Sequence, residues 1–243
     1  DRLKASEAMQ LFKEANRMLN QLDAVYQTHG VVNIMDANAD GDDLLLNGKR
    51  FPLLRQQAAK LKKDDPFLCL SDFVRPLSSG ITDKIGAFAT TVDAEMEQLY
   101  AEDDYKRMLA QTLSDRLAEA TAEKLHEDVR KKLWGYAPDE NLSVKDLHNE
   151  KYQGIRPAVG YPSLPDQSIN FLLDELLDMK QIGISLTENG MMKPHASVCG
   201  LMFAHPASRY FSIGKIGEDQ LADYAARRGM SIEETKKFLA ANL

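Results

Sequence analysis

Apolar residues recur at helical spacing in two long stretches of the chain. The first stretch predicts a helix from about residue 5 to residue 26, with Ser6 as its cap. The second runs from about residue 94 to residue 133 and predicts one long helix or two, with one apolar stripe and charges opposite it. The members of this stripe are Tyr105, Leu109, Leu113, Leu117, Leu125, Val129 and Leu133. Gly135 and Pro138 then end the helix, because glycine suits a C-terminal cap and proline cannot continue the ladder.

Shorter apolar runs predict strands and further helices. The strand-like runs are residues 31–35, 44–46, 67–70, 85–89, 197–203 and 210–216. An acidic turn at 38–43 separates the first two. Asp166 resembles the cap of a helix that extends to Met179, and Ser231 with Glu234 fits a capping box for a short last helix. Strands and helices do not alternate regularly, so the pattern predicts an α+β fold with an antiparallel or mixed sheet, in one domain over residues 1–243.

Composition and charge exclude several classes of partner. Hydrophobic residues make up 44% of the 243 positions, yet no apolar run approaches the ~18 residues needed to span a bilayer. The charged N-terminus lacks the apolar core of a signal peptide, so we expect a cytoplasmic location and no membrane partner. The net charge of −7 argues against nucleic acid as the main partner. Basic clusters at 60–63, 130–132 and 236–237 are interleaved with acidic residues and are interpreted as solvated helix faces.

Familiar catalytic and metal-binding motifs are missing from the sequence. Cys69 and Cys199 lie in apolar stretches without a Cys/His cluster and are predicted core residues. Residues 36–42 imitate the opening of a calcium-binding loop, but Asn47 stands where that loop needs a bidentate glutamate. An acidic hairpin turn is therefore predicted there. There is no Gly-rich phosphate-binding motif, and His205 is interpreted as a turn or packing residue.

The segment 154–165 holds the candidate chemistry, with three prolines and two glycines in twelve positions. Such a long irregular stretch in a compact domain is unusual unless it binds something. Arg156 can clamp a carboxylate with two parallel hydrogen bonds, and Gly160 lets the backbone approach a ligand closely. Tyr161 can lie against an aromatic ring or a cation. These residues suit a zwitterionic ligand with a flat ring, and a rigid structural turn explains them equally well.

An acidic row follows the predicted long helix. Asp115, Glu119 and Glu123 are spaced by four residues, which puts their carboxylates on one face. Such a row repels itself, so a nearby cation would stabilise it. Read alone, it is interpreted as a solvated face.

The motifs along the chain, taken together, resemble the C-terminal activation domain of cobalamin-dependent methionine synthase. The similarity covers nearly the whole chain in order, and the Arg-x-x-x-Gly-Tyr turn at 156–161 is its most specific part. The matching stretches are 115–120, 125–127, 134–138, 152–158, 160–162, 186–188, 196–198 with Gly200, 205–206, 219–220 and 223–225.

The resemblance implies a C-shaped α+β domain with a twisted antiparallel sheet and flanking helices. Such a domain binds S-adenosylmethionine and presents its methyl group for reductive methylation of inactive cob(II)alamin, which reactivates methionine synthase. The cobalamin is held by another domain or chain, and a flavodoxin or flavoprotein reductase supplies the electron. Because the sequence carries no cobalamin-binding, folate-binding or zinc-thiolate module, we do not expect the chain to make methionine alone.

Site residues carry over from the family by matching position. Arg156 is expected to hold the methionyl carboxylate of the ligand. The backbone of Ala158 and Gly160 is expected to line the turn, with Tyr161 beside it. The remaining expected contacts are Tyr210 at the adenosyl part, Phe211 at a position often held by tyrosine, and Glu119 facing the ammonium or sulfonium charge.

One departure from the family changes the expected affinity. The family has an Asp-Trp-Thr-Pro-Phe-like element before the first long helix, whose aspartate contacts the ligand, whereas Trp134 is the only tryptophan here. We therefore expect a truncated N-terminal edge and weaker ligand binding than in an intact domain. Two alternatives stay open: a docking module for a cobalamin protein with a degenerate ligand site, and a free-standing methyltransferase, for which no base presents itself.

Overall fold

The computed structural model of the chain describes residues 2–57 and 65–243. The helices are α1 (Arg2–Asp23), α2 (Asp104–Asp128), α3 (Val144–His148), α4 (Ile169–Leu177), α5 (Glu218–Arg228) and α6 (Ile232–Phe238). The strands are β1 (Thr28–Asp40), β2 (Asp43–Leu46), β3 (Lys49–Pro52), β4 (Asp83–Val92), β5 (Ser185–Leu186), β6 (Met192–Lys193) and β7 (Ser197–Met202).

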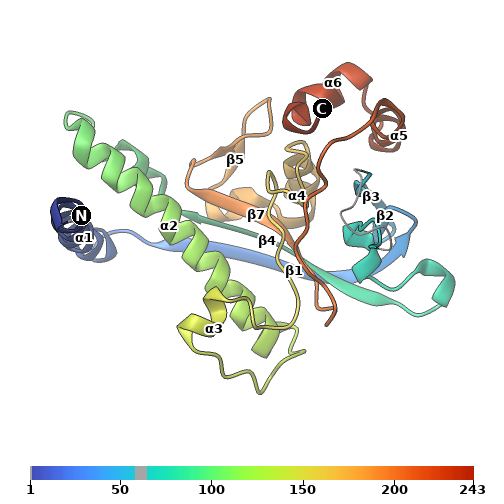
Figure 1. Cartoon of the computed structure of the whole chain (residues 1–243), viewed down its shortest axis with the longest axis horizontal. Helices are drawn as coiled ribbons and strands as arrows, with labels where there is room; N and C mark the ends of the chain where they lie inside the picture. Colours follow the sequence, from blue (N-terminus) through green and yellow to red (C-terminus); the bar gives the residue numbers. More distant parts are fainter. Residues whose placement is uncertain (1, 58–64) are drawn as a thin grey trace.

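A five-stranded sheet of order β3-β2-β1-β4-β7 forms the centre of the molecule, and each neighbouring pair is antiparallel. In Figure 1, α1 and one end of α2 lie at one side of the twisted sheet, and α5 and α6 lie toward the other. The expected C-shaped α+β fold with flanking helices is thereby confirmed. The predicted hairpin at 38–43 is also confirmed, since β1 and β2 pair from Asp40 and Asp43 outward.

Helix α2 packs closely on one face of the sheet because small side chains face the strands. Its buried positions are Ala110, Ser114, Ala118, Ala122 and His126. Most of the predicted stripe lies one position away from these residues. Its members Leu109, Leu113, Leu117 and Leu125 are half-buried at the flanks, and Tyr105 and Leu133 are exposed, whereas Val129 is fully buried as predicted. Small residues allow the helix backbone to approach the sheet, where the Thr90 hydroxyl of β4 donates to the Ala118 carbonyl at 3.0 Å.

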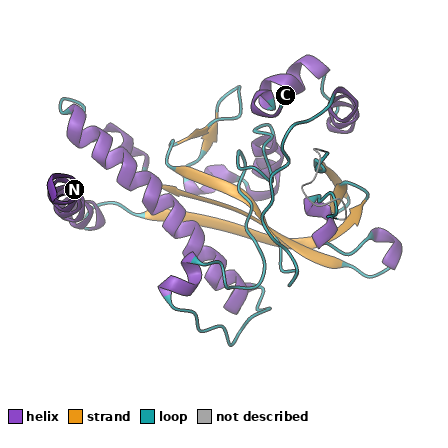
Figure 2. Cartoon of the chain, viewed as in Figure 1, coloured by secondary structure: helices purple, strands orange, loops and turns teal. Residues whose placement is uncertain are grey.

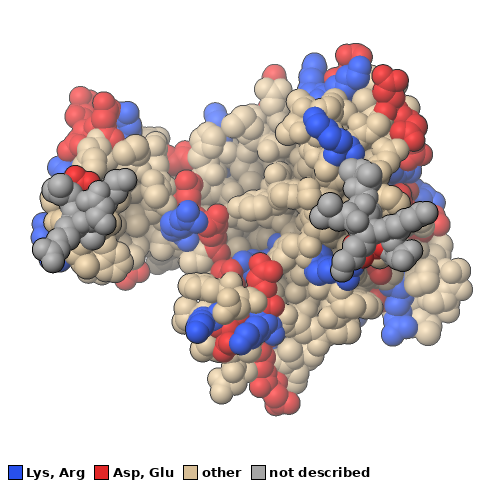
Figure 3. All heavy atoms as spheres, in the orientation of Figure 1, with Lys and Arg blue, Asp and Glu red and all other residues tan. Residues whose placement is uncertain are grey.

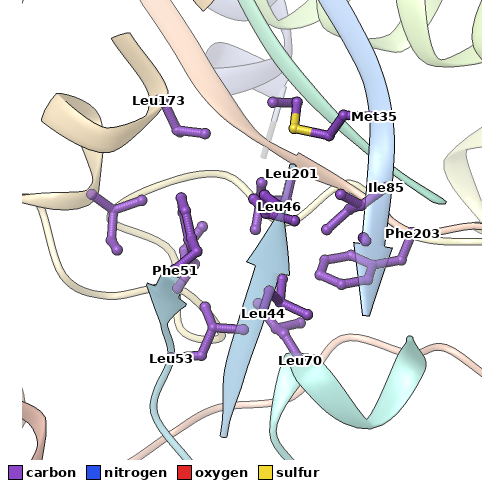
Figure 4. Packing of buried hydrophobic residues seen from close by; sticks show 14 of the residues in the cluster. Met35, Leu44, Leu46, Phe51, Leu53, Leu70, Ile85, Leu173, Leu201 and Phe203 are labelled. Atoms are coloured by element: carbon purple, nitrogen blue, oxygen red, sulfur yellow. The ribbon is translucent and has the colours of Figure 1, made fainter. Parts of the chain in front are cut away.

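The opposite face of the sheet carries the largest apolar cluster. Figure 4 shows Leu44 and Leu46 of β2 with Ile85 of β4 and Phe203, which follows β7, in one packed group. Helix α4 adds Ile169, Leu173 and Leu177 to this cluster. Both Cys69 and Cys199 are buried and unpaired, as predicted. Because α2 and this cluster cover β4 from both sides, its last eight residues are all buried.

Several predicted elements are wrong. Residues 210–216 form no strand, because Ile213 and Ile216 bury three positions apart against α5 and α6 rather than alternating in a ladder. Residues 67–70 form one isolated β-bridge rather than a strand. The Asp72 carboxylate accepts a hydrogen bond from the Cys69 amide, and a 3-10 turn begins there. Residues 94–98 are a separate 3-10 turn before α2. Ser168, not Asp166, is the N-terminal cap of α4, although the Asp166 carboxylate accepts a hydrogen bond from the Ser168 amide. The capping box of Ser231 and Glu234 is confirmed.

The charged surface corrects one further interpretation. Acidic and basic side chains are mixed over the face shown in Figure 3. Along α2 they form ion pairs such as Arg116 with Glu119 and Lys124 with Asp128. Arg130, however, is fully buried, so the cluster 130–132 is not a solvated face throughout. The cluster 60–63 lies outside the described residues. In the ranges 2–57 and 65–243, no helix is long and apolar enough to cross a membrane.

Candidate ligand-binding site

Two irregular segments converge over the sheet beside α2, where Figure 2 shows loops rather than regular elements. Segment 154–165 follows β7 through isolated bridges of Ile155 with Phe203 and of Ala158 with Gly200. Segment 210–216 joins it where the Ile213 amide donates to the Pro162 carbonyl at 2.8 Å. A groove of about 800 Å³ lies between these segments and α2, which is within the range of small-molecule sites.

The structure brings six of the seven predicted site residues to the wall of this groove. They are Glu119, Arg156, Ala158, Tyr161, Tyr210 and Phe211. Gly160 is not part of the wall. It has a positive φ of 86° and its amide donates to the Leu164 carbonyl at 2.9 Å, so it shapes the turn that carries Tyr161.

Close packing on β7 fixes the path of segment 154–165. A Cβ atom added at Gly200 would lie 2.2 Å from the Pro157 carbonyl oxygen, so only glycine permits this approach. The Leu201 amide donates to that same oxygen at 3.0 Å, and the Val159 amide donates to the Cys199 carbonyl at 2.9 Å. The residues on both sides of Arg156 are therefore anchored to a buried strand rather than left free in a loop.

Arg156 is held from three directions. One guanidinium nitrogen donates to the Tyr152 hydroxyl at 3.1 Å and another pairs with the Glu123 carboxylate. Its backbone amide donates to the Tyr210 hydroxyl at 3.0 Å. Burial lowers the pKa of this guanidinium, but Tyr152, Tyr210 and Glu123 outweigh burial and raise the pKa overall. With 16% of its side chain exposed and unused N–H donors, Arg156 is a fixed cation at the groove wall.

Glu119 and Tyr161 lie together along the wall. The Tyr161 hydroxyl donates to Glu119 at 3.4 Å, and Arg116 pairs with the other oxygen of this carboxylate at 2.8 Å. Partial burial, followed by the neighbouring Glu119 charge, raises the pKa of the Tyr161 phenol. Tyr161 stays 54% exposed, so its ring is available to a ligand.

Tyr210 and Phe211 contribute aromatic surface, each in a different way. Burial, followed by the neighbouring Tyr152 phenol, raises the pKa of Tyr210 far above its ordinary range, so its hydroxyl stays neutral. This hydroxyl accepts a hydrogen bond from the Arg156 backbone amide. Phe211 packs against Phe73 with ring centroids 6.4 Å apart. It also touches the apolar clusters under β2 and under α5, so it anchors segment 210–216.

The acidic row on α2 divides between two surfaces. Glu119 and Glu123 face the groove and each has an arginine partner, Arg116 and Arg156 respectively. Asp115 lines a smaller adjacent cavity, where burial, followed by the Glu119 charge, raises its pKa. The cation that the row needs is thus supplied by the protein itself for Glu119 and Glu123.

Sequence reasoning missed several polar residues of the site, among them His148, Glu150 and Tyr152. His148 and Glu150 reach the groove wall from the end of α3, a helix that the sequence analysis did not predict. Tyr152 lies behind Arg156 and is 8% exposed. The described part of the chain holds no group of three or more His, Cys, Asp or Glu side chains that could bind a metal ion. The aspartates of the β1–β2 turn pair with Arg50 and Arg55 instead.

These features define an α+β ligand-binding domain whose groove presents one fixed guanidinium, paired carboxylates and aromatic rings, a set that suits a zwitterionic ligand. The chain belongs to the family described as vitamin B12 dependent methionine synthase, activation domain, whose sequence model matches residues 1–229. A solved relative is the MetH reactivation domain, crystallised with AdoHcy bound. It is 44% identical, with a TM-score of 0.93 over 100% of this chain and 79% of that one.

Proposed function

We propose that the groove binds S-adenosylmethionine and that the domain presents its methyl group for reductive methylation of cob(II)alamin held by another domain or chain. The observation that carries this proposal is Arg156, a cation fixed at the wall beside Glu119, Glu123 and two exposed tyrosine rings. Family membership and the AdoHcy-bound relative support it.

Each predicted residue has a role that its position supports. Arg156 binds the methionyl carboxylate through its free N–H donors, and Glu119 faces the ammonium or sulfonium charge. Tyr161 lies beside the turn that Ala158 and Gly160 form, where its exposed ring is available to the ligand. Tyr210 and Phe211 contact the adenosyl part, where stacking needs a flat apolar surface.

The domain contributes positioning rather than acid–base chemistry. When the methyl group leaves, the electron pair of the S–CH3 bond stays on sulfur and the ligand becomes a neutral thioether. Reduced cobalamin held by the partner would supply the nucleophile, so no side chain of this chain would have to take up or release a proton. Holding donor and acceptor together lowers the barrier through proximity.

The partners proposed here follow from this role. A cobalamin-binding domain of methionine synthase must approach the groove, and a flavodoxin or flavoprotein reductase must supply the electron. Among the basic clusters, Lys236 and Lys237 in α6 are exposed, whereas Arg130 is buried.

We treat residues 1–243 as one functional domain. The cytoplasmic location and the exclusion of nucleic acid stay predictions from the sequence.

The test is reconstitution of methyl transfer. The chain is mixed with a cobalamin-binding fragment of methionine synthase that holds cob(II)alamin, with methyl-labelled S-adenosylmethionine and a chemical one-electron reductant in place of the unidentified reductase. Methylcobalamin is followed by its absorption spectrum and by the label. We expect it to form only when the chain and S-adenosylmethionine are both present, and S-adenosylhomocysteine is the matched control.

Two results would contradict the proposal. If the chain binds the cobalamin fragment but no methylcobalamin forms, it is a docking module with a degenerate ligand site. If label passes to an acceptor without cobalamin, the chain is a free-standing methyltransferase.

A further inference from the structure

Tyr152 joins the groove to a buried cluster behind it. Its hydroxyl accepts a hydrogen bond from the Arg156 guanidinium at 3.1 Å. Its ring lies against two other groups: the Arg130 guanidinium, 4.4 Å from the ring centroid, and the His126 ring, 5.1 Å away and nearly perpendicular. Tyr152 is not part of the groove wall, so its effect on a ligand passes through the two wall residues with which it interacts, Arg156 and Tyr210. Only the contact with Arg156 bears on a carboxylate.

The groups that hold the Tyr152 ring are themselves fixed. Arg130 is fully buried, and its Nε and Nη2 donors reach the two Glu140 oxygens at 2.7 Å each. His126 is also fully buried, and its Nε2 lies 3.4 Å from the Tyr136 hydroxyl. The Tyr152 ring is thus confined between a bidentate ion pair and a buried imidazole. Confinement of the ring fixes the position of its hydroxyl.

A fixed hydroxyl matters because an arginine side chain is otherwise flexible. Glu123 alone, with 41% of its side chain exposed, would leave the Arg156 guanidinium able to rotate about their contact. A second contact on a different nitrogen, from Tyr152, sets the plane of the guanidinium. A carboxylate binds most strongly to a guanidinium whose plane is already set, since little freedom is lost on binding.

We propose that Tyr152 is a positioning residue, which orients the Arg156 guanidinium and so gives the groove its selectivity for ligands that carry an α-carboxylate. This inference rests on the proposed function. It differs from a packing role because it predicts a loss that depends on one group of the ligand.

The experiment compares two ligands and two matched variants by calorimetric titration. The ligands are S-adenosylmethionine and decarboxylated S-adenosylmethionine, which lacks only the α-carboxylate. The variants are Tyr152→Phe and Tyr136→Phe, each of which removes one hydroxyl from the same buried cluster. Tyr136 donates to the Gln153 carbonyl at 3.3 Å and has no contact with the Arg156 side chain among the described hydrogen bonds. Thermal unfolding of each variant confirms that it is folded.

We expect Tyr152→Phe to weaken S-adenosylmethionine binding about tenfold and to weaken binding of the decarboxylated ligand much less, since only the contact with Arg156 depends on the carboxylate. Tyr136→Phe should leave both affinities unchanged. An equal loss of affinity for both ligands would mean that Tyr152 does not act on the carboxylate contact, and it would overturn the inference. Unchanged binding in Tyr152→Phe, with binding lost in Arg156→Ala, would overturn it while the proposed function stands. If the unmutated chain binds neither ligand, both proposals fail.

Discussion

Two arginines in the same part of the molecule show how similar ion pairs serve different ends. Arg130 is fully buried and pairs with Glu140 through two nitrogens. Arg156 is partly exposed, pairs with Glu123 through one nitrogen and lies on the groove wall. Tyr152 touches both, one through its ring and the other through its hydroxyl.

The difference separates an interaction that holds the fold from one that is available to a ligand. Arg130 has no route to solvent, and its partner satisfies two of its donors. Arg156 keeps donors free and an anionic partner that is 41% exposed. Burial and the number of contacts, rather than the presence of an ion pair, therefore distinguish structural arginines from binding arginines here.

The largest expected effect on stability is at the buried pair of Arg130 and Glu140. Glu140→Ala leaves the Arg130 charge buried without a partner and should lower the free energy of unfolding by about 3–5 kcal/mol. Glu123→Ala, its matched control, leaves Arg156 near the groove and should cost less than about 1 kcal/mol. Urea unfolding measures both. Equal losses would mean that burial does not distinguish the two pairs.

A smaller effect is expected where β7 meets the segment that carries Arg156. Gly200→Ala forces the Pro157 carbonyl away from β7 and should cost about 1–3 kcal/mol of stability, with weaker S-adenosylmethionine binding because Arg156 moves with Pro157. Gly30→Ala is the control, since its Cβ would come no closer than 3.4 Å to any neighbour, the nearest being the ends of the Leu125 and Thr90 side chains. Urea unfolding and calorimetric titration are the measurements. Undiminished binding in Gly200→Ala would show that the segment does not depend on this contact.

The smallest effect concerns pH and involves both arginines. Burial, followed by the charges of Arg130 and Arg156, holds the pKa of His126 well below its ordinary value of 6.5. The unfolded chain therefore binds a proton that the folded chain does not. Stability from this group is complete above pH 6.5 and is lost as the pH falls below it, by at most about 1.4 kcal/mol per pH unit. Urea unfolding between pH 5 and 8 should show a shallower dependence for His126→Gln, and identical slopes would contradict the prediction.

Local patterns in the sequence predict much of the fold. Helical spacing identifies α1 and α2, the acidic turn identifies the β1–β2 hairpin, and a capping box identifies α6. The predictions fail where tertiary packing decides, as at 210–216, whose apolar residues bury without joining a ladder.

The candidate site, like the fold, has some features that the sequence predicts and others that it does not. Segment 154–165 is recognisable from its prolines and glycines, and six of the residues carried over from the family meet at one groove. The support behind Arg156 is not recognisable. Arg130 stands in a basic cluster that resembles a solvated face, and Glu140 lies beyond the turn that ends the helix, so no spacing connects them.

Calorimetric titration of S-adenosylmethionine into the unmutated chain and into Arg156→Ala tests the central claim most directly. Loss of a positioned carboxylate contact should cost on the order of 2–4 kcal/mol, so heat of binding in the unmutated chain should disappear in the variant. Equal affinity in the two proteins, or no binding by the unmutated chain, would contradict the assignment of this groove as the S-adenosylmethionine site.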